Sequence, residues 1–179
     1  MQPPENLFLI GEREGFSHDL GTLIGMMEYT RATTLMEIRD LTPEQLDFLP
    51  HPDGNSIGML ALHIAAVEAV YQILTFEGRE EPNVEEAERW NAALELGEKG
   101  RKTIRGHTAD FYIQTLAEVR EKTLAAFRER DDAFLQITRA WWHDRQSNNF
   151  FAWFHVFEDE LNHRGQMRLI RDRYIKQKA

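Results

Sequence analysis

The chain has 179 residues, which is the size of one ordinary domain, and its 42% hydrophobic and 28% charged residues are close to globular averages. This composition excludes a disordered or fibrous protein. With 21 basic and 30 acidic residues the net charge is −9, which repels phosphate backbones and anionic lipids, so we expect neither nucleic acid nor a membrane as a partner. Because the chain has no cysteine, any metal would need imidazole and oxygen ligands.

The sequence also gives an expectation about location. The longest stretch without Asp, Glu, Lys or Arg, residues 54–67, is shorter than the ~20 residues that cross a membrane. Residues 1–14 lack the basic segment and apolar run of a secretory signal. We therefore expect a cytoplasmic protein.

The apolar pattern predicts an all-α chain, because apolar residues recur three and four apart and no stretch shows sustained alternation. The first helix is expected over residues 17–41. Ser56 is the expected cap of a second helix, which begins at Ile57 and continues to about Phe76, before Gly78.

The remaining chain has no proline after Pro82, which favours long helices. We expect a short helix over residues 84–96, a loose glycine-containing connection, a third long helix over residues 110–129 and a fourth over residues 149–174. Four long helices with one extended crossover between the second and third predict a four-helix bundle, formed by residues 1–179 as a single domain.

Two polar residues share the apolar stripe of the last helix. Ala152, Val156, Met167 and Ile170 form that stripe, and Asp159 and His163 fall within it, one turn apart. On the second helix His63 lies on or beside the apolar face. A divalent ion held by His63, Asp159 and His163 would satisfy all three, and such a set leaves positions open, as in catalytic zinc sites.

A simpler interpretation of these residues stays open. His63 could be a hydrogen-bonded core histidine, and Asp159 and His163 could form only a salt bridge. His155, Glu68 and Gln166 are weaker candidates for supporting the site. No dedicated general base is evident, because the spacing places Glu68, Glu158 and Glu160 no better than chance.

Two segments resemble the DinB/YfiT-like family of bacterial metal-binding four-helix bundles. Residues 56–68, SIGMLALHIAAVE, are similar to that family's second-helix segment, whose histidine is a metal ligand. Residues 155–166, HVFEDELNHRGQ, are similar to its last-helix signature, which commonly ends in His-Arg-Gly-Gln. Where many members have a histidine four residues before the terminal one, this chain has Asp159.

The resemblance implies a divalent metal, most often zinc or nickel, and for some members a thiol S-transferase activity that uses bacillithiol or a related low-molecular-weight thiol. Because this chain has no cysteine, the thiol would have to arrive as a substrate. A metal-dependent hydrolase and a non-catalytic, stress-related binder of a metal or small molecule are the alternatives.

The last helix has a second apolar face opposite the first. Phe150, Phe154, Phe157 and Leu161 point away from the stripe of the candidate ligands. This face would be covered either by the crossover, which offers few apolar residues, or by a second copy of the chain. We expect a two-fold homodimer with the last helices at or near the interface.

Overall fold

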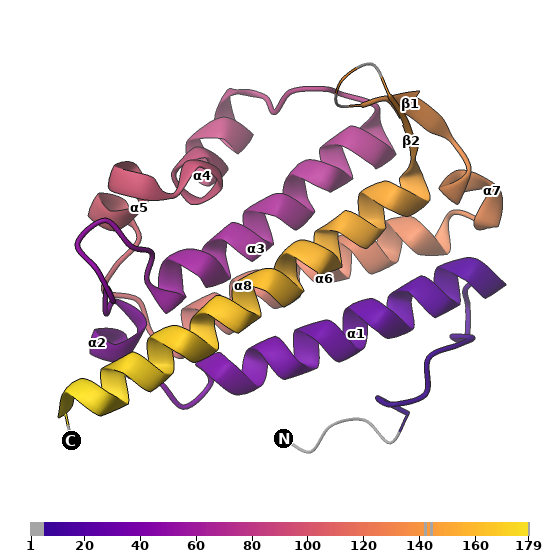
Figure 1. Cartoon of the computed structure of the whole chain (residues 1–179). Helices are drawn as coiled ribbons and strands as arrows, with labels where there is room; N and C mark the ends of the chain where they lie inside the picture. Colours follow the sequence, from indigo (N-terminus) through magenta and orange to yellow (C-terminus); the bar gives the residue numbers. More distant parts are fainter. Residues whose placement is uncertain (1–5, 142, 144, 179) are drawn as a thin grey trace.

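The structure is a computed structural model that describes residues 6–141, 143 and 145–178, with the backbone alone for 175–178. Figure 1 shows the arrangement of its elements. They are α1 (His18–Ile38), α2 (Pro43–Leu46), α3 (Ile57–Gln72), the π-helical turn η1 (Ile73–Glu77), α4 (Val84–Glu95), α5 (Gly97–Thr103), α6 (Ala109–Arg128), α7 (Asp132–Leu135), β1 (Thr138–Ala140), β2 (Gln146–Asn148) and α8 (Asn149–Lys178).

The four long helices α1, α3, α6 and α8 form a bundle, which confirms the predicted fold class. In this bundle α3 packs against α6 and α8, and α1 packs against α8 and α6 (Figure 1). The crossover between α3 and α6 includes α4, which packs against α3, and α5, which packs against α4. The crossover thus lies against the helix that carries His63.

Local capping fixes the ends of the long helices close to their predicted positions. The Ser56 hydroxyl accepts a hydrogen bond from the backbone N–H of Met59 at the start of α3, as predicted. The Thr108 hydroxyl likewise accepts a hydrogen bond from the backbone N–H of Phe111 at the start of α6. At the other end of α3 the π-helical turn η1 stops at Gly78, whose φ of +69° favours glycine.

Two parts of the chain differ from the sequence prediction. The expected loose connection after residue 96 contains helix α5, in which Gly100 approaches α4 and α3 so closely that a Cβ there would lie 2.8 Å from Met59 Cε. Between α7 and α8 the short strands β1 and β2 pair in an antiparallel hairpin that the apolar pattern did not indicate. Both elements are too short to carry a periodic signal.

The core has two clusters of buried apolar side chains along the bundle. One contains Met59, Leu60, Leu116, Met167 and Ile170, and the other contains Leu23, Met27, Phe127, Trp153 and Val156. The predicted apolar stripe of the last helix is confirmed, because Ala152, Val156, Met167 and Ile170 are all at most 6% exposed.

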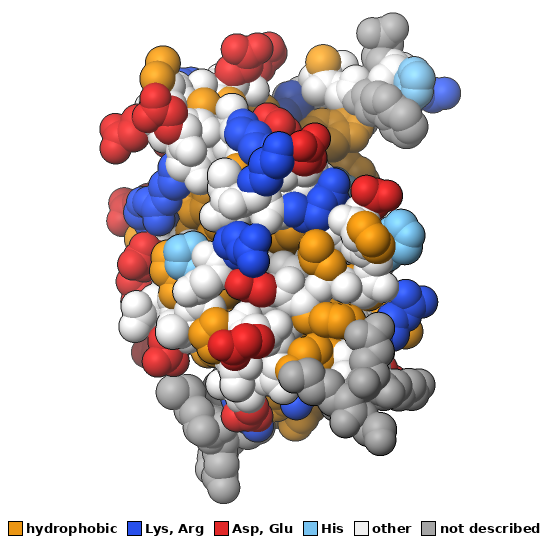
Figure 2. Space-filling model, turned by 90° about the vertical axis from the view of Figure 1, so that its left-hand side faces the viewer, with side chains coloured by type: hydrophobic (Ala, Val, Ile, Leu, Met, Phe, Trp, Pro, Cys, Tyr) orange, Lys and Arg blue, Asp and Glu red, His pale blue; other side chains and the backbone are white. Residues whose placement is uncertain are grey.

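Helix α3 and turn η1 together are long and apolar enough to cross a membrane by length and composition alone. However, 67% of the most apolar window in Ile57–Glu77 is buried inside the fold, as in the core helix of a soluble protein. The end of the molecule formed by α2, α5 and the last turns of α8 is seen in Figure 2. Its described side chains carry both charges, interspersed with apolar groups, and form no continuous basic surface in this view.

The second apolar face of α8 is only partly as predicted. Phe157 is 6% exposed and belongs to a core cluster, and Phe150 and Leu161 pack against the same cluster. Phe154 remains 41% exposed and Phe151 remains 40% exposed. The expectation for Phe157 was wrong because the bundle surrounds α8 over a wider arc than one stripe.

Candidate metal centre

The structure brings His63 on α3 together with Asp159 and His163 on α8. Each residue offers a ligand atom, and these atoms all lie within 4.8 Å of one another. His63 Nε2 is 3.7 Å from Asp159 Oδ2, and His163 Nε2 is 3.4 Å from Asp159 Oδ1. The three side chains are 13–21% exposed, so the group is sheltered but open to solvent.

Hydrogen bonds at Nδ1 orient both imidazole rings so that Nε2 faces Asp159. Nδ1 of His63 lies 2.8 Å from the backbone carbonyl oxygen of Ala93 on α4. Because a carbonyl can only accept, Nδ1 is the protonated nitrogen and Nε2 faces Asp159. Nδ1 of His163 lies 3.3 Å from the amide oxygen of Gln166, which again directs Nε2 toward the carboxylate.

The protonation of the three side chains follows from burial and mutual charge. Burial lowers the pKa of His63 below the ordinary 6.5, with the hydrogen bond to Ala93 as a partial offset. Burial alone would raise the pKa of Asp159, but its contacts with His163 and the charge of His63 lower it. For His163 burial opposes the charged form, yet the Asp159 carboxylate raises its pKa above 6.5. Burial therefore favours the neutral form of His63, whereas the Asp159 carboxylate favours the protonated form of His163.

This donor set fits a divalent ion. Tetrahedral zinc, with bonds of about 2.0–2.1 Å, holds its ligand atoms roughly 3.3–3.4 Å apart. The two nitrogen–oxygen separations, 3.7 and 3.4 Å to different oxygens of Asp159, are close to this spacing. Asp159 Oδ2 is a buried oxygen with no hydrogen-bond partner, which is costly unless a cation or donor satisfies it. With the two imidazole lone pairs beside it, the set provides three ligand atoms of types that zinc and nickel accept.

Comparison with known proteins gives the family. A family model described as mycothiol-S-transferase matches residues 22–175, a range that includes His63, Asp159 and His163. The chain belongs to the mycothiol-S-transferase family. This is a DinB/YfiT-like family, as the two motif segments indicated. No curated protein matches the chain.

Membership places the chain in a metal-dependent class of thiol S-transferases. The thiol in the family's name is mycothiol, whereas the resemblance alone had named bacillithiol or a related thiol. The crossover contact between Ala93 and His63 was not visible in the sequence, because a backbone carbonyl leaves no residue-type signal.

The weaker candidates for residues that support the metal site differ in where they lie and what they contact. Gln166 touches His163, as described above. His155 lies outside the trio: its Nδ1 pairs with Glu158 at 2.9 Å, and its side chain is 40% exposed. Glu68 and Glu160 are fully buried in ion pairs, so neither is available as a base.

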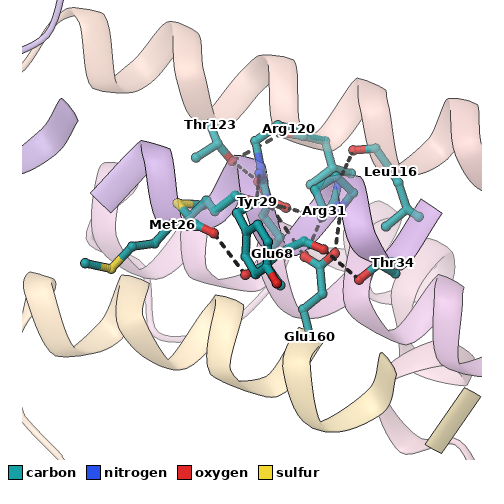
Figure 3. A network of polar contacts seen from close by, with 12 residues as sticks. Met26, Tyr29, Arg31, Thr34, Glu68, Leu116, Arg120, Thr123 and Glu160 are labelled. Atoms are coloured by element: carbon teal, nitrogen blue, oxygen red, sulfur yellow. Dashed lines mark hydrogen bonds and ion pairs between the residues drawn. The ribbon is translucent and has the colours of Figure 1, made fainter. Parts of the chain in front are cut away.

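These ion pairs form a charged layer, composed of Arg31, Glu68, Arg120 and Glu160, that sequence reasoning missed. Figure 3 shows the four side chains meeting inside the bundle, one from each of α1, α3, α6 and α8. Arg31 donates to Glu160 Oε1 and to Glu68 Oε2, both at 2.9 Å. Arg120 donates to Glu68 Oε1 at 2.7 Å. Although burial raises the pKa of Glu68, Arg120 and Arg31 lower it to about 2.

The charged layer fixes how α3 and α8 sit relative to each other. Glu160 directly follows Asp159, and Glu68 lies five residues after His63. Both carboxylates bond the same guanidinium, that of Arg31. A shift of α8 along α3 by one turn would break these bonds and would also separate Asp159 from His63. The layer therefore supports the trio through the helix register.

The pKa directions predict that acidification weakens metal binding by the trio. A metal can bind imidazole only when the ring is neutral, so protonation of His163, which the Asp159 carboxylate favours, competes with the metal. We expect affinity to fall as the pH decreases through the pKa of His163, which lies above 6.5. Equilibrium dialysis between about pH 8 and pH 5, with circular dichroism to monitor the fold, measures this. Constant occupancy to the acid end, with the helices intact, would contradict histidine ligation.

Proposed function

We propose that this protein joins mycothiol, through its sulfur, to a small electrophile, with a divalent ion held by His63, Asp159 and His163. The arrangement around Asp159 is the observation that carries the proposal. Its Oδ2 is buried without a hydrogen-bond partner and lies 3.7 Å from His63 Nε2, while its Oδ1 lies 3.4 Å from His163 Nε2. The family match supports the reaction class, and the geometry supports the ligand set.

A divalent ion, when bound, supplies positive charge that lowers the pKa of a nearby thiol or water toward neutral pH. The chain's own residues prepare the place for it. Ala93 holds His63 in the tautomer with Nε2 free, and Gln166 does the same for His163. Asp159 contributes a negative charge that partly balances the ion. The thiol itself comes from the substrate, since the chain has no cysteine.

Zinc and nickel are the metals that we propose for the site, because both accept two imidazoles and a carboxylate. We also propose a cytoplasmic location. The exposed aromatic side chains of Phe151 and Phe154 are consistent with a homodimer that covers the outer face of α8. Phe157 would not belong to such an interface, because it lies in the core.

The proposal is tested with protein purified without added metal. We expect about one zinc or nickel ion per chain by elemental analysis. With mycothiol and an alkyl bromide, we expect formation of the thioether with release of bromide and a proton. The activity should disappear after chelation and return with the metal.

The other outcomes separate the alternatives. Metal-dependent cleavage of esters or amides without any thiol would favour a hydrolase. A stoichiometric, tightly bound ion with no turnover across a broad set of electrophiles would favour a binding protein. Protein that is active with mycothiol but contains no metal would contradict the proposed ligand set.

A further inference from the structure

A cavity of about 220 Å³ lies between α8 and the segment that precedes α3. Its lining combines an apolar floor with a polar rim. The floor includes Ile170, which is 6% exposed. The cavity is lined by Pro50, Asn55, Gln166, Leu169, Ile170 and Arg173.

Gln166 connects this cavity to the trio. Its side chain lines the cavity and also contacts Nδ1 of His163 at 3.3 Å. Residues 163, 166, 170 and 173 follow each other at helical spacing on one side of α8. At ~1.5 Å per residue, Gln166 lies about 5 Å and Arg173 about 15 Å along the helix from His163. The cavity therefore begins beside the trio and extends about three turns away from it.

The polar rim has unused hydrogen-bond donors. Among the described residues, neither the guanidinium of Arg173 nor the side-chain amide of Asn55 makes a hydrogen bond or ion pair with another part of the chain. By contrast, Arg168 and Arg171 on the same helix both pair with Glu37. Within the part of the chain that the structure describes, Arg173 is thus a cation without a carboxylate partner, at the cavity of a protein whose net charge is −9. An arginine in this position suits hydroxyl and carboxylate oxygens, which its planar group can bind in pairs.

We infer that this cavity binds the oxygen-rich body of the thiol substrate, with Arg173 and Asn55 as specificity-determining residues. The inference rests on the proposed function, because it places the sulfur at the trio. A substrate whose polar body extends from the trio along α8 past Gln166 can occupy both places at once. A minimal thiol such as 2-mercaptoethanol cannot reach Arg173, so the cavity selects large polar thiols over small ones.

The test compares Arg173→Met, Asn55→Ala and Arg173→Lys with wild-type protein. For mycothiol we expect KM to rise about tenfold in Arg173→Met and about fivefold in Asn55→Ala, because each loses hydrogen bonds to substrate oxygens. The rise should be smaller for 2-mercaptoethanol. Arg173→Lys should recover part of the loss, since it keeps the charge but not the planar fork.

The control is Arg128→Met. Arg128 is an exposed arginine that lies over the ring of Phe16, at the end of α6. The Arg128→Met variant removes the same charge from the opposite end of the bundle. We expect its KM for both thiols to match that of the wild type. Metal content should be unchanged in every variant, which separates a substrate effect from damage to the trio.

A binding measurement makes the inference independent of turnover. S-methyl mycothiol cannot react, and calorimetry on metal-free protein should show a Kd about tenfold weaker for Arg173→Met than for wild type. If wild-type protein transfers mycothiol but Arg173→Met keeps wild-type KM and Kd, the cavity assignment is overturned and the proposed function stands. If S-methyl mycothiol binds in an Arg173-dependent way without any transfer by wild type, the cavity stands and the transferase proposal falls. Absence of both binding and transfer overturns both.

Discussion

Replacing His163 by alanine is expected to remove the metal and the thiol transfer together. In the proposed site His163 supplies one of three ligand atoms, and its loss leaves a carboxylate and one imidazole. We therefore expect metal affinity to fall by more than about 100-fold, beyond the effect of losing a supporting hydrogen bond. His63→Ala and Asp159→Ala should likewise lose both the metal and the thiol transfer. Elemental analysis after dialysis and turnover with mycothiol measure the two effects.

Two further variants act as controls for the ligand assignment. His155→Ala removes a histidine that lies one turn from Asp159 but outside the trio, and it should keep its metal. Asp159→His restores the more common ligand of DinB/YfiT-like proteins, and it should also keep its metal. Stoichiometric metal in His163→Ala would count strongly against the site. Loss of metal in Asp159→His would show that the carboxylate has a further role.

Replacing Glu68 by alanine is expected to cause the largest loss of stability. Glu68 is fully buried and bonds Arg31, Arg120 and the hydroxyl of Thr123. Its removal leaves two guanidinium groups buried with one carboxylate. Breaking a buried ion pair in this way costs about 3–5 kcal/mol. For a chain of this size the melting temperature should fall by roughly 6–20 °C, measurable by calorimetry or circular dichroism.

A matched surface variant gives the comparison. Glu98 pairs with Lys102 one turn away on α5, and both side chains are more than 70% exposed. We expect Glu98→Ala to change the free energy of unfolding by less than about 0.5 kcal/mol, because water and salt screen exposed pairs. A Glu68→Ala variant as stable as Glu98→Ala would mean that the charged layer contributes nothing to the fold.

Replacing all four members of the charged layer by apolar residues of similar volume tests what the layer is for. Such replacements are often neutral or stabilising by about 1–4 kcal/mol, because they remove the cost of burying the charges. If the layer fixes the register of α3 and α8, this variant should be stable but bind metal less tightly than wild type. Wild-type metal affinity in a stable apolar variant would show that packing alone sets the register.

The sequence by itself determined the helices and predicted which residue types could serve as metal ligands. Proline positions, the Ser56 cap and the spacing of apolar residues predicted the long helices closely, since these signals act within a few residues. The i, i+4 spacing of Asp159 and His163 likewise placed both on one side of a single helix. The short helix α5 and the hairpin were missed because neither is long enough to show a period.

Only the tertiary structure decided how these parts meet. Whether His63 faces Asp159 depends on the relative position of two helices separated by some 70 residues of chain, and no local pattern encodes that. The charged layer and the Ala93 carbonyl set the relative position of these two helices, through contacts between helices that are distant in sequence. Glu68 and Glu160 could not be recognised as ion-paired from spacing, because their partners Arg31 and Arg120 lie on two other helices. Helical periodicity is a local property, whereas the pairing of buried charges is a property of the assembled bundle.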